Sequence, residues 1–154
     1  MLTINITRSN SPFLDISLKE MASQFDGQDY HWSLLDLWAI GDLGPKESMS
    51  ELEERANSSA NGAFMTWSEI KQFAEKIDDL IDGQFIGCKD KSKLKRYATV
   101  RQMYDACDLV LRRFDSSFWI VHAQDQAIID RTIEHFSKFE DIEITEENDS
   151  VWVD

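Results

Sequence analysis

The sequence predicts a single α+β domain over residues 1–154, with a mainly antiparallel sheet and helices packed on one face. Apolar and polar residues alternate in several short runs, two helix-start signatures stand mid-chain, and turn formers separate β-rich runs further on. The 154 residues are 42% hydrophobic, with five Trp and nine Phe, which suffices for a substantial core. Only two Pro and no internal repeat occur, so we expect no linker.

The first part of the chain favours extended structure. Residues 2–6 alternate apolar and polar side chains, which predicts a strand that ends at a Ser-Asn-Ser-Pro turn. Residues 13–25 mix the two periods and predict no element. Residues 32–40 form an apolar stretch that fits a buried strand or a short helix, and Gly41–Pro45 ends it.

Two capping boxes predict helix starts in the middle of the chain. Ser48 with Glu51, and Thr66 with Glu69, fit the pattern in which a cap hydroxyl and a glutamate satisfy the first helical amides. A loop is expected between the two helices at residues 57–62.

The second of these helices shows the clearest stripe in the sequence. Its apolar positions at helical spacing are Ile70, Phe73, Ala74, Ile77 and then Leu80 or Ile81. We expect Gly83 to end it, and residues 84–88 to form a short strand.

The region after this strand contains a predicted hairpin. Residues 97–108 fit either a helix or a strand: the spacing of Val100, Met103, Tyr104 and Cys107 favours a helix, the following Leu109–Leu111 favours a strand, and we expect a change of state near Asp108. Residues 109–114 and 118–123 are β-rich runs on either side of three turn formers, Asp115, Ser116 and Ser117. We interpret these serines as turn residues rather than as nucleophiles.

The end of the chain predicts one more helix and a closing hairpin. Asp125 can cap a helix whose apolar positions are Ile129, Ile133 and Phe136. Residues 142–144 and 151–153 have the alternation of two strands joined by a turn.

No catalytic constellation is visible, and we expect neither enzyme activity, nor a cofactor, nor a metal. The sequence contains no phosphate-binding glycine loop, nucleophile elbow or zinc-binding helix motif, and its three histidines, His31, His122 and His135, are far apart in sequence. Cys88 and Cys107 lack CxxC spacing and are expected to be reduced, buried thiols. The alternative is a small enzyme in which the fold brings His31, His122 or Cys88 together.

The charge balance is strongly acidic, with 29 Asp and Glu against 16 Lys and Arg and a net charge of −13. One acidic region contains Asp36, Asp42, Glu47, Glu51, Glu53 and Glu54. The other contains Glu140, Asp141, Glu143, Glu146, Glu147 and Asp149. If the fold brings the two regions together, they form one field that attracts a basic protein; the alternative is a solvated helix face and a solubilising tail.

Other partner classes fit less well. The basic residues Lys89, Lys91, Lys93, Lys95, Arg96 and Arg101 lack the interleaved aromatics of a nucleic-acid site, so we expect no nucleic acid. The amino terminus lacks a signal-peptide pattern and no run of about eighteen apolar residues occurs, so we expect no membrane partner and a cytoplasmic location.

Aromatic residues beside acids are typical of interface hot spots. Trp38 and Trp152 are the two tryptophans that we expect to be exposed anchors. The candidate partner-binding residues are Asp36, Trp38, Asp42, Glu51, Glu53, Glu54, Glu146, Glu147, Asp149 and Trp152.

Three further segments stand out: Trp38–Leu43, the helix start Thr66–Trp67 that leads into Ile81–Gly83, and Phe114–Trp119. Within a similarity over residues 30–140, these segments resemble small bacterial toxin-immunity proteins of contact-dependent or polymorphic toxin systems. The resemblance implies a cytoplasmic protein that binds and neutralises a cognate toxin domain, often a nuclease. An acidic surface suits that role, because nuclease active sites are positively charged.

The sequence thus favours an immunity protein, as a monomer or weak homodimer, that neutralises a basic toxin domain. The alternatives are a small enzyme of unknown reaction and a self-associating adaptor subunit.

Overall fold

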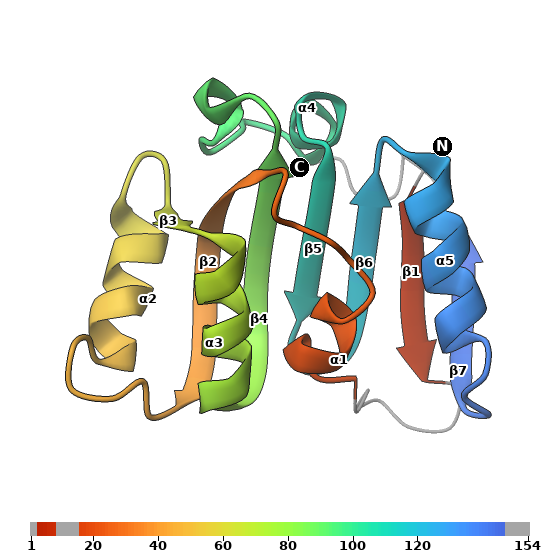
Figure 1. The fold of residues 1–154 in the computed structure, drawn as a ribbon, viewed down its shortest axis with the longest axis horizontal. Helices are drawn as coiled ribbons and strands as arrows, with labels where there is room; N and C mark the ends of the chain where they lie inside the picture. Colours follow the sequence, from red (N-terminus) through yellow and green to blue (C-terminus); the bar gives the residue numbers. More distant parts are fainter. Residues whose placement is uncertain (1–2, 9–15, 147–154) are drawn as a thin grey trace.

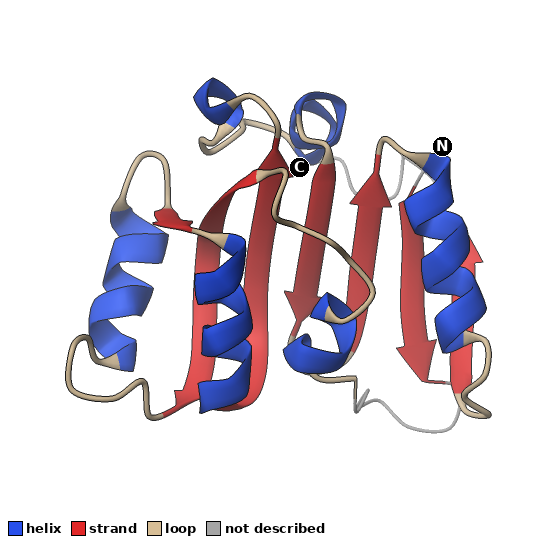
Figure 2. Ribbon diagram, in the orientation of Figure 1, coloured by secondary structure: helices blue, strands red, loops and turns tan. Residues whose placement is uncertain are grey.

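Seven strands form one antiparallel sheet in the computed structural model, which describes residues 3–8 and 16–146 (Figures 1 and 2). The strand order is β3-β2-β4-β5-β6-β1-β7, and each neighbouring pair is antiparallel. The strands are β1 Thr3–Arg8, β2 His31–Gly41, β3 Ala63–Met65, β4 Ile77–Cys88, β5 Leu109–Phe114, β6 Phe118–Ala123 and β7 Ile142–Glu146. The helices are α1 Leu18–Ala22, α2 Met49–Ser58, α3 Trp67–Lys76, α4 Val100–Ala106 and α5 Gln126–Phe136, with a 3₁₀ turn η1 at Lys91–Lys93. The predicted α+β domain is confirmed.

Four helices pack on one side of the sheet, here called the front face. Figure 1 shows α1, α3 and α5 in front of the strands and α2 beside β2 at the edge of the sheet, where Leu52 and Ala56 of α2 join the main core. The main core lies beneath them and includes Trp32, which stacks on Trp67 with ring centroids 5.0 Å apart. Trp119 is also fully buried, and its indole N–H donates to the carbonyl of Ile16 at 2.9 Å. Most of the sheet's large side chains therefore lie between the strands and these four helices.

The opposite face, here called the back face, carries a second and smaller core. Leu35, Ile86 and Val110 of the strands pack there with Val100 and Met103 of α4. The segment of residues 89–107, which contains η1 and α4, lies behind the upper ends of the strands in Figure 1. The expectation of helices on one face thus holds for four of the five helices, and α4 takes the other face.

Both capping boxes are confirmed. The Ser48 hydroxyl accepts from the N–H of Glu51 at 3.1 Å, and the Glu51 carboxylate accepts from the N–H of Ser48 at 3.3 Å. Thr66 and Glu69 repeat the arrangement at 3.1 and 2.9 Å. These reciprocal bonds satisfy amides that have no partner within the first helical turn, so α2 and α3 begin where their sequences indicate.

The helix predicted to reach Ile81 is shorter than expected. It ends at Lys76, and Ile77 already has extended backbone angles, with φ −86 and ψ 145. Gly83 ends no helix; it lies inside β4, paired with Leu37 of β2. The stripe continued beyond Lys76 because the spacing of these apolar residues also fits a strand with register shifts, and pairing with β2 overrides the helical pattern.

Several shorter segments also differ from expectation or resolve an ambiguity. Residues 32–40 belong to strand β2, while α1 and the three-residue strand β3 had no sequence signal. The loop expected from residue 57 begins later, because Asn57 and Ser58 belong to α2.

The second half of the chain follows the sequence signals closely. Residues 97–108 contain α4, which ends just before Asp108, and β5 and β6 form the predicted hairpin. Asp125 caps α5 by accepting from the N–H of Ala127 at 2.9 Å. β7 pairs with β1 at the sheet edge, and the predicted partner run 151–153 lies outside the described residues.

Candidate functional site

Two large apolar side chains of β2 are exposed on the back face. Trp38 and Ile40 are 56% and 53% exposed. They lie at the end of β2 away from the segment of residues 89–107, on the half of the back face that no described helix covers. The sequence expectation that Trp38 is exposed is confirmed, and its role as a binding anchor stays a prediction.

A bulge at Asp36 places Trp38 on this face. Leu35 pairs with Gln84 and Leu37 pairs with Gly83, so Asp36 is an extra residue in β2, with a left-handed φ of 51. Successive strand residues alternate between faces, and one extra residue inverts the alternation. Leu37 therefore enters the front core, and Trp38 turns to the back. Aspartate adopts this backbone conformation more readily than most residues.

Aspartates of β4 lie directly beside these apolar side chains. Trp38 pairs with Asp82 and Ile40 pairs with Asp79 across the β2–β4 ladder. Residues paired in this way have adjacent side chains on one face. Asp79 also lines the cavity on the front face, and its carboxylate accepts from the Ser116 hydroxyl at 3.3 Å. We call Asp36, Trp38, Ile40, Asp42, Asp79 and Asp82 the Trp38 surface.

Two phenylalanines extend the row of side chains beyond Asp82. Phe114 of β5 pairs with Phe118 of β6, and their rings stack with centroids 5.0 Å apart. Both side chains are half-buried and pack against the smaller core. Asp82 joins this pair to the Trp38 surface, because its carboxylate accepts from the backbone N–H of Asp115 at 2.8 Å.

The acidic residues of α2 are divided between structural and solvent-facing roles. Glu51 belongs to the capping box, and the Glu53 carboxylate accepts from the backbone N–H of Ala39 at 3.1 Å. Glu54 is exposed. Asp42 is exposed as well, and its carboxylate accepts from the N–H of Gly44 at 2.9 Å. Of the predicted α2 residues, Glu54 is thus the one with a solvent-facing carboxylate and no structural contact in the described chain.

The second acidic region lies at the other edge of the sheet. Glu146 belongs to β7, while β2 lies beside β3 at the opposite edge. The two acidic regions therefore do not merge through Glu146, because four strands separate β2 from β7. The candidates Glu147, Asp149 and Trp152 lie outside the described residues.

Asp79 and Asp82 are members of the surface that the sequence did not indicate. The predicted helix, expected to end at Gly83, includes both positions. The signal that places them beside Trp38 is the pairing of β4 with β2, which is a long-range contact.

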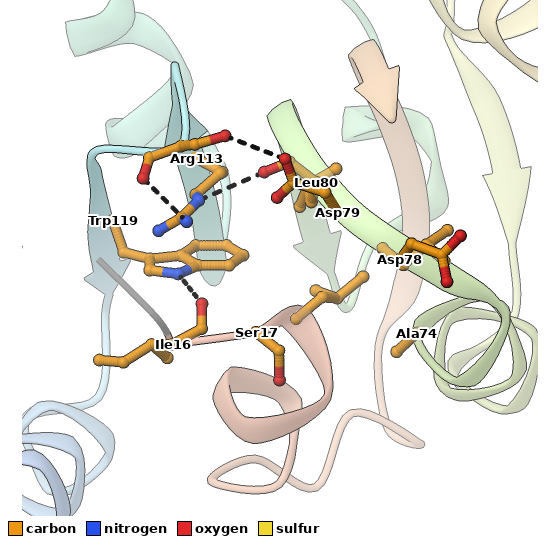
Figure 3. Close-up of a pocket in the computed structure, with 11 residues that line it drawn as sticks. Ile16, Ser17, Ala74, Asp78, Asp79, Leu80, Arg113 and Trp119 are labelled. Atoms are coloured by element: carbon orange, nitrogen blue, oxygen red, sulfur yellow. Dashed lines mark hydrogen bonds between the residues drawn. The ribbon is translucent and has the colours of Figure 1, made fainter. Parts of the chain in front are cut away.

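A cavity on the front face opens between α1, α3 and β4 (Figure 3). Its volume is about 340 Å³. Arg113 lines it, with its guanidinium 5.4 Å from the ring centroid of Trp119, and donates to the carbonyls of Leu80 at 3.4 Å and Ser116 at 3.1 Å. The Ser17 hydroxyl in this cavity serves as the cap of α1. These contacts tie the β5–β6 turn to β4.

The three histidines are not brought together. His122 is buried in β6, where its ring contacts the hydroxyl of Thr3 at 2.7 Å and the carbonyl of Tyr104 at 2.9 Å. His135 of α5 contacts the carboxylate of Glu20 at 2.7 Å, and His31 is exposed at the start of β2. Each histidine thus has a separate environment.

The two cysteines are buried free thiols beside the smaller core, as expected. A hydrogen bond with Cys88, together with burial, raises the pKa of Cys107. Because the thiolate is the nucleophilic form, this shift disfavours reaction of the Cys107 thiol.

Among residues 3–8 and 16–146, no group of three or more His, Cys, Asp or Glu side chains has the arrangement of a metal site. No helix in that part of the chain is long and apolar enough to cross a membrane. Comparison with protein-family models, curated proteins and solved structures returns no match.

Proposed function

We propose that this chain is a cytoplasmic immunity-type protein that binds and neutralises a basic bacterial toxin domain through the Trp38 surface. The observation that carries the proposal is the exposure of Trp38 and Ile40 together, with aspartates on the neighbouring strand. Tryptophan anchors that become desolvated in a complex contribute much of the binding energy at protein interfaces.

The charge of the chain supports a basic partner. Asp36, Asp42, Asp79 and Asp82 accompany the apolar pair, and the whole chain carries a net charge of −13. Complementary charge accelerates association and disfavours partners of like charge. Nucleic acid is negatively charged like this surface, whereas a protein domain that holds phosphate in its active site has a positively charged site.

The first test is co-expression with the carboxy-terminal domain encoded immediately upstream. We expect the two chains to co-purify and growth inhibition by the upstream domain to disappear. Absence of both binding and rescue would remove the proposal.

Variants then locate the surface. Trp38→Ala is expected to weaken the complex by about tenfold or more, because an anchor is lost. Phe139→Ala is the matched control, since Phe139 is 43% exposed and follows α5 on the other side of the sheet. Equal losses in the two variants would contradict the assignment of the Trp38 surface.

Two acid-to-lysine variants test whether the charge of the Trp38 surface accelerates association with the partner. Asp42→Lys is expected to lower the association rate at low salt, and added salt should reduce the difference from the wild type. Glu134→Lys, at an exposed position of α5, changes the net charge equally and should lower the association rate less. An equal effect would show that net charge acts, rather than this surface.

A further inference from the structure

We propose that a groove on the back face binds a small monocarboxylate, held by the guanidinium of Arg112. The groove lies between α4 and the strands, with a volume of about 360 Å³, and Arg112 is among the residues that line it. This is within the usual size range of small-molecule sites. The proposal is independent of toxin binding.

Arg112 is a buried cation whose contacts are neutral. It is 7% exposed. Its Nε donates to Gln84 Oε1 at 3.1 Å, its Nη1 donates to the hydroxyl of Tyr104 at 3.1 Å, and its guanidinium lies 4.6 Å from the ring centroid of Phe114. Among the described residues, no carboxylate forms an ion pair with it, and Nη2 donates to none of them. A buried charge normally has a counter-ion, so this arrangement is suited to an anion from outside the chain.

The other charges at the groove indicate a monoanion. Arg96 also lines it, but its Nη1 donates to Asp36 at 3.2 Å, its Nε donates to the carbonyl of Ser59 at 3.1 Å, and its Nη2 donates to the carbonyl of Ala56. Arg96 and Asp36 therefore balance each other, which leaves the single charge of Arg112. A carboxylate matches this single charge better than a phosphate dianion.

Gln84 offers a second donor at the same place. Its Oε1 accepts from Arg112, and its side-chain NH₂ bonds to no described residue. One carboxylate oxygen can therefore accept from Arg112 Nη2 and the other from Gln84.

The remaining wall of the groove is mixed. Leu35 of β2 and Val100 and Met103 of α4 line it but are themselves buried, and Tyr97 and Thr99 add polar groups. The carbon chain attached to the carboxylate would therefore contact both apolar and polar side chains. The carboxylate can belong to a free acid or to a glutamate side chain of a peptide, and the probes below separate these sources.

The test is an NMR titration of the full chain that follows the Arg112 Nε–Hε signal. The probes are hexanoate, the neutral isostere hexanamide, inorganic phosphate, and the peptide acetyl-Gly-Glu-Gly-amide. We expect hexanoate to cause a saturable shift of this signal. Its affinity should be at least about tenfold higher than that of hexanamide. Tighter binding of hexanoate than of the peptide supports a free acid, and the reverse supports a peptide side chain.

Variants complete the test. Arg112→Met should weaken hexanoate binding by about tenfold or more, and Gln84→Met by a smaller factor. Arg101→Met removes the same charge from an exposed position on α4 and should leave affinity within about twofold. If Arg112→Met does not fold, Gln84→Met and the wild-type Arg112 signal remain as readouts.

Three results would overturn the carboxylate site. They are an equal response to hexanamide, tighter binding of phosphate than of hexanoate, and the absence of a saturable shift at about 50 mM probe. Equal losses in the Arg101 and Arg112 variants would also overturn it. None of these results depends on the toxin experiment, so the two proposals fail separately.

Discussion

Asn57 of α2 bonds both backbone groups of Leu37 in β2. Its Oδ1 accepts from the Leu37 N–H at 2.6 Å, and its Nδ2 donates to the Leu37 carbonyl at 3.1 Å. β3 pairs with β2 only at residues 32–34, so the rest of that edge has no neighbouring strand among the described residues. The amide of Asn57 thus takes the place of a strand, which protects the edge from pairing with another chain.

Replacing Asn57 with Ala should lower the free energy of unfolding by about 1 kcal/mol, because two backbone groups lose their partner and return to solvent. Urea denaturation measures the change, and light scattering should show increased association through the open edge. Ser58→Ala is the control, since Ser58 is also exposed near the end of α2. A stability equal to the wild type would contradict a structural role for the Asn57 bonds.

Substitution of Trp67 should lower the stability much more than substitution of Trp38. Trp67 is 4% exposed and stacks on Trp32, so Trp67→Ala should cost about 3–5 kcal/mol of unfolding free energy. Trp38→Ala should cost less than about 1 kcal/mol, because its side chain is largely in water. Iodide quenching of fluorescence provides a second measurement: the quenchable fraction should fall in Trp38→Phe and remain in Trp67→Phe. Loss of quenching in the latter would place the exposed indole elsewhere.

The sequence predicted those elements whose signals are local. The capping residues Ser48, Thr66 and Asp125 each act within a few residues of their own position, and the Asp115–Ser117 turn joins strands adjacent in sequence. Such signals do not depend on how the rest of the chain folds.

Long-range pairing explains what the sequence did not predict. The end of α3 at Lys76 and the bulge at Asp36 both arise where β4 pairs with β2. The candidate site was therefore predicted only in part: Trp38 stood out as an aromatic beside acids, whereas Asp82 reaches it only through the ladder. Glu53 resembled a free surface acid because nothing local indicated its bond to β2.

Tyr97 should make the stability fall at alkaline pH. Burial, and then the nearby thiols of Cys107 and Cys88, raise the pKa of Tyr97 from 10.0 to about 12. Its neutral hydroxyl donates to the carbonyl of Lys93 at 2.6 Å. The unfolded chain loses this proton first, so the contribution to stability is complete below pH 10.0 and is lost as pH rises to about 12.

Tyr97→Phe tests this pH dependence. Urea midpoints measured between the two pKa values of Tyr97 should fall less steeply with pH in the variant than in the wild type, and the step of the native phenolate absorbance titration at about pH 12 should disappear. Identical pH slopes for the two proteins would contradict the raised pKa.

Ser116→Gly should stabilise the β5–β6 hairpin. Asp115 and Ser116 have φ values of 48 and 55, the left-handed backbone that a type I′ turn requires at both central positions. Glycine adopts this conformation without the steric cost that a side chain imposes, while the exposed bond from the Ser116 hydroxyl to Asp79, at 3.3 Å, is lost. We expect a net gain of up to about 1 kcal/mol in the free energy of unfolding, measured by urea denaturation. Ser117→Gly is the matched control: Ser117 has no positive φ, so added freedom in the unfolded chain should destabilise it. A gain in both variants would show that backbone strain at Ser116 is not the cause.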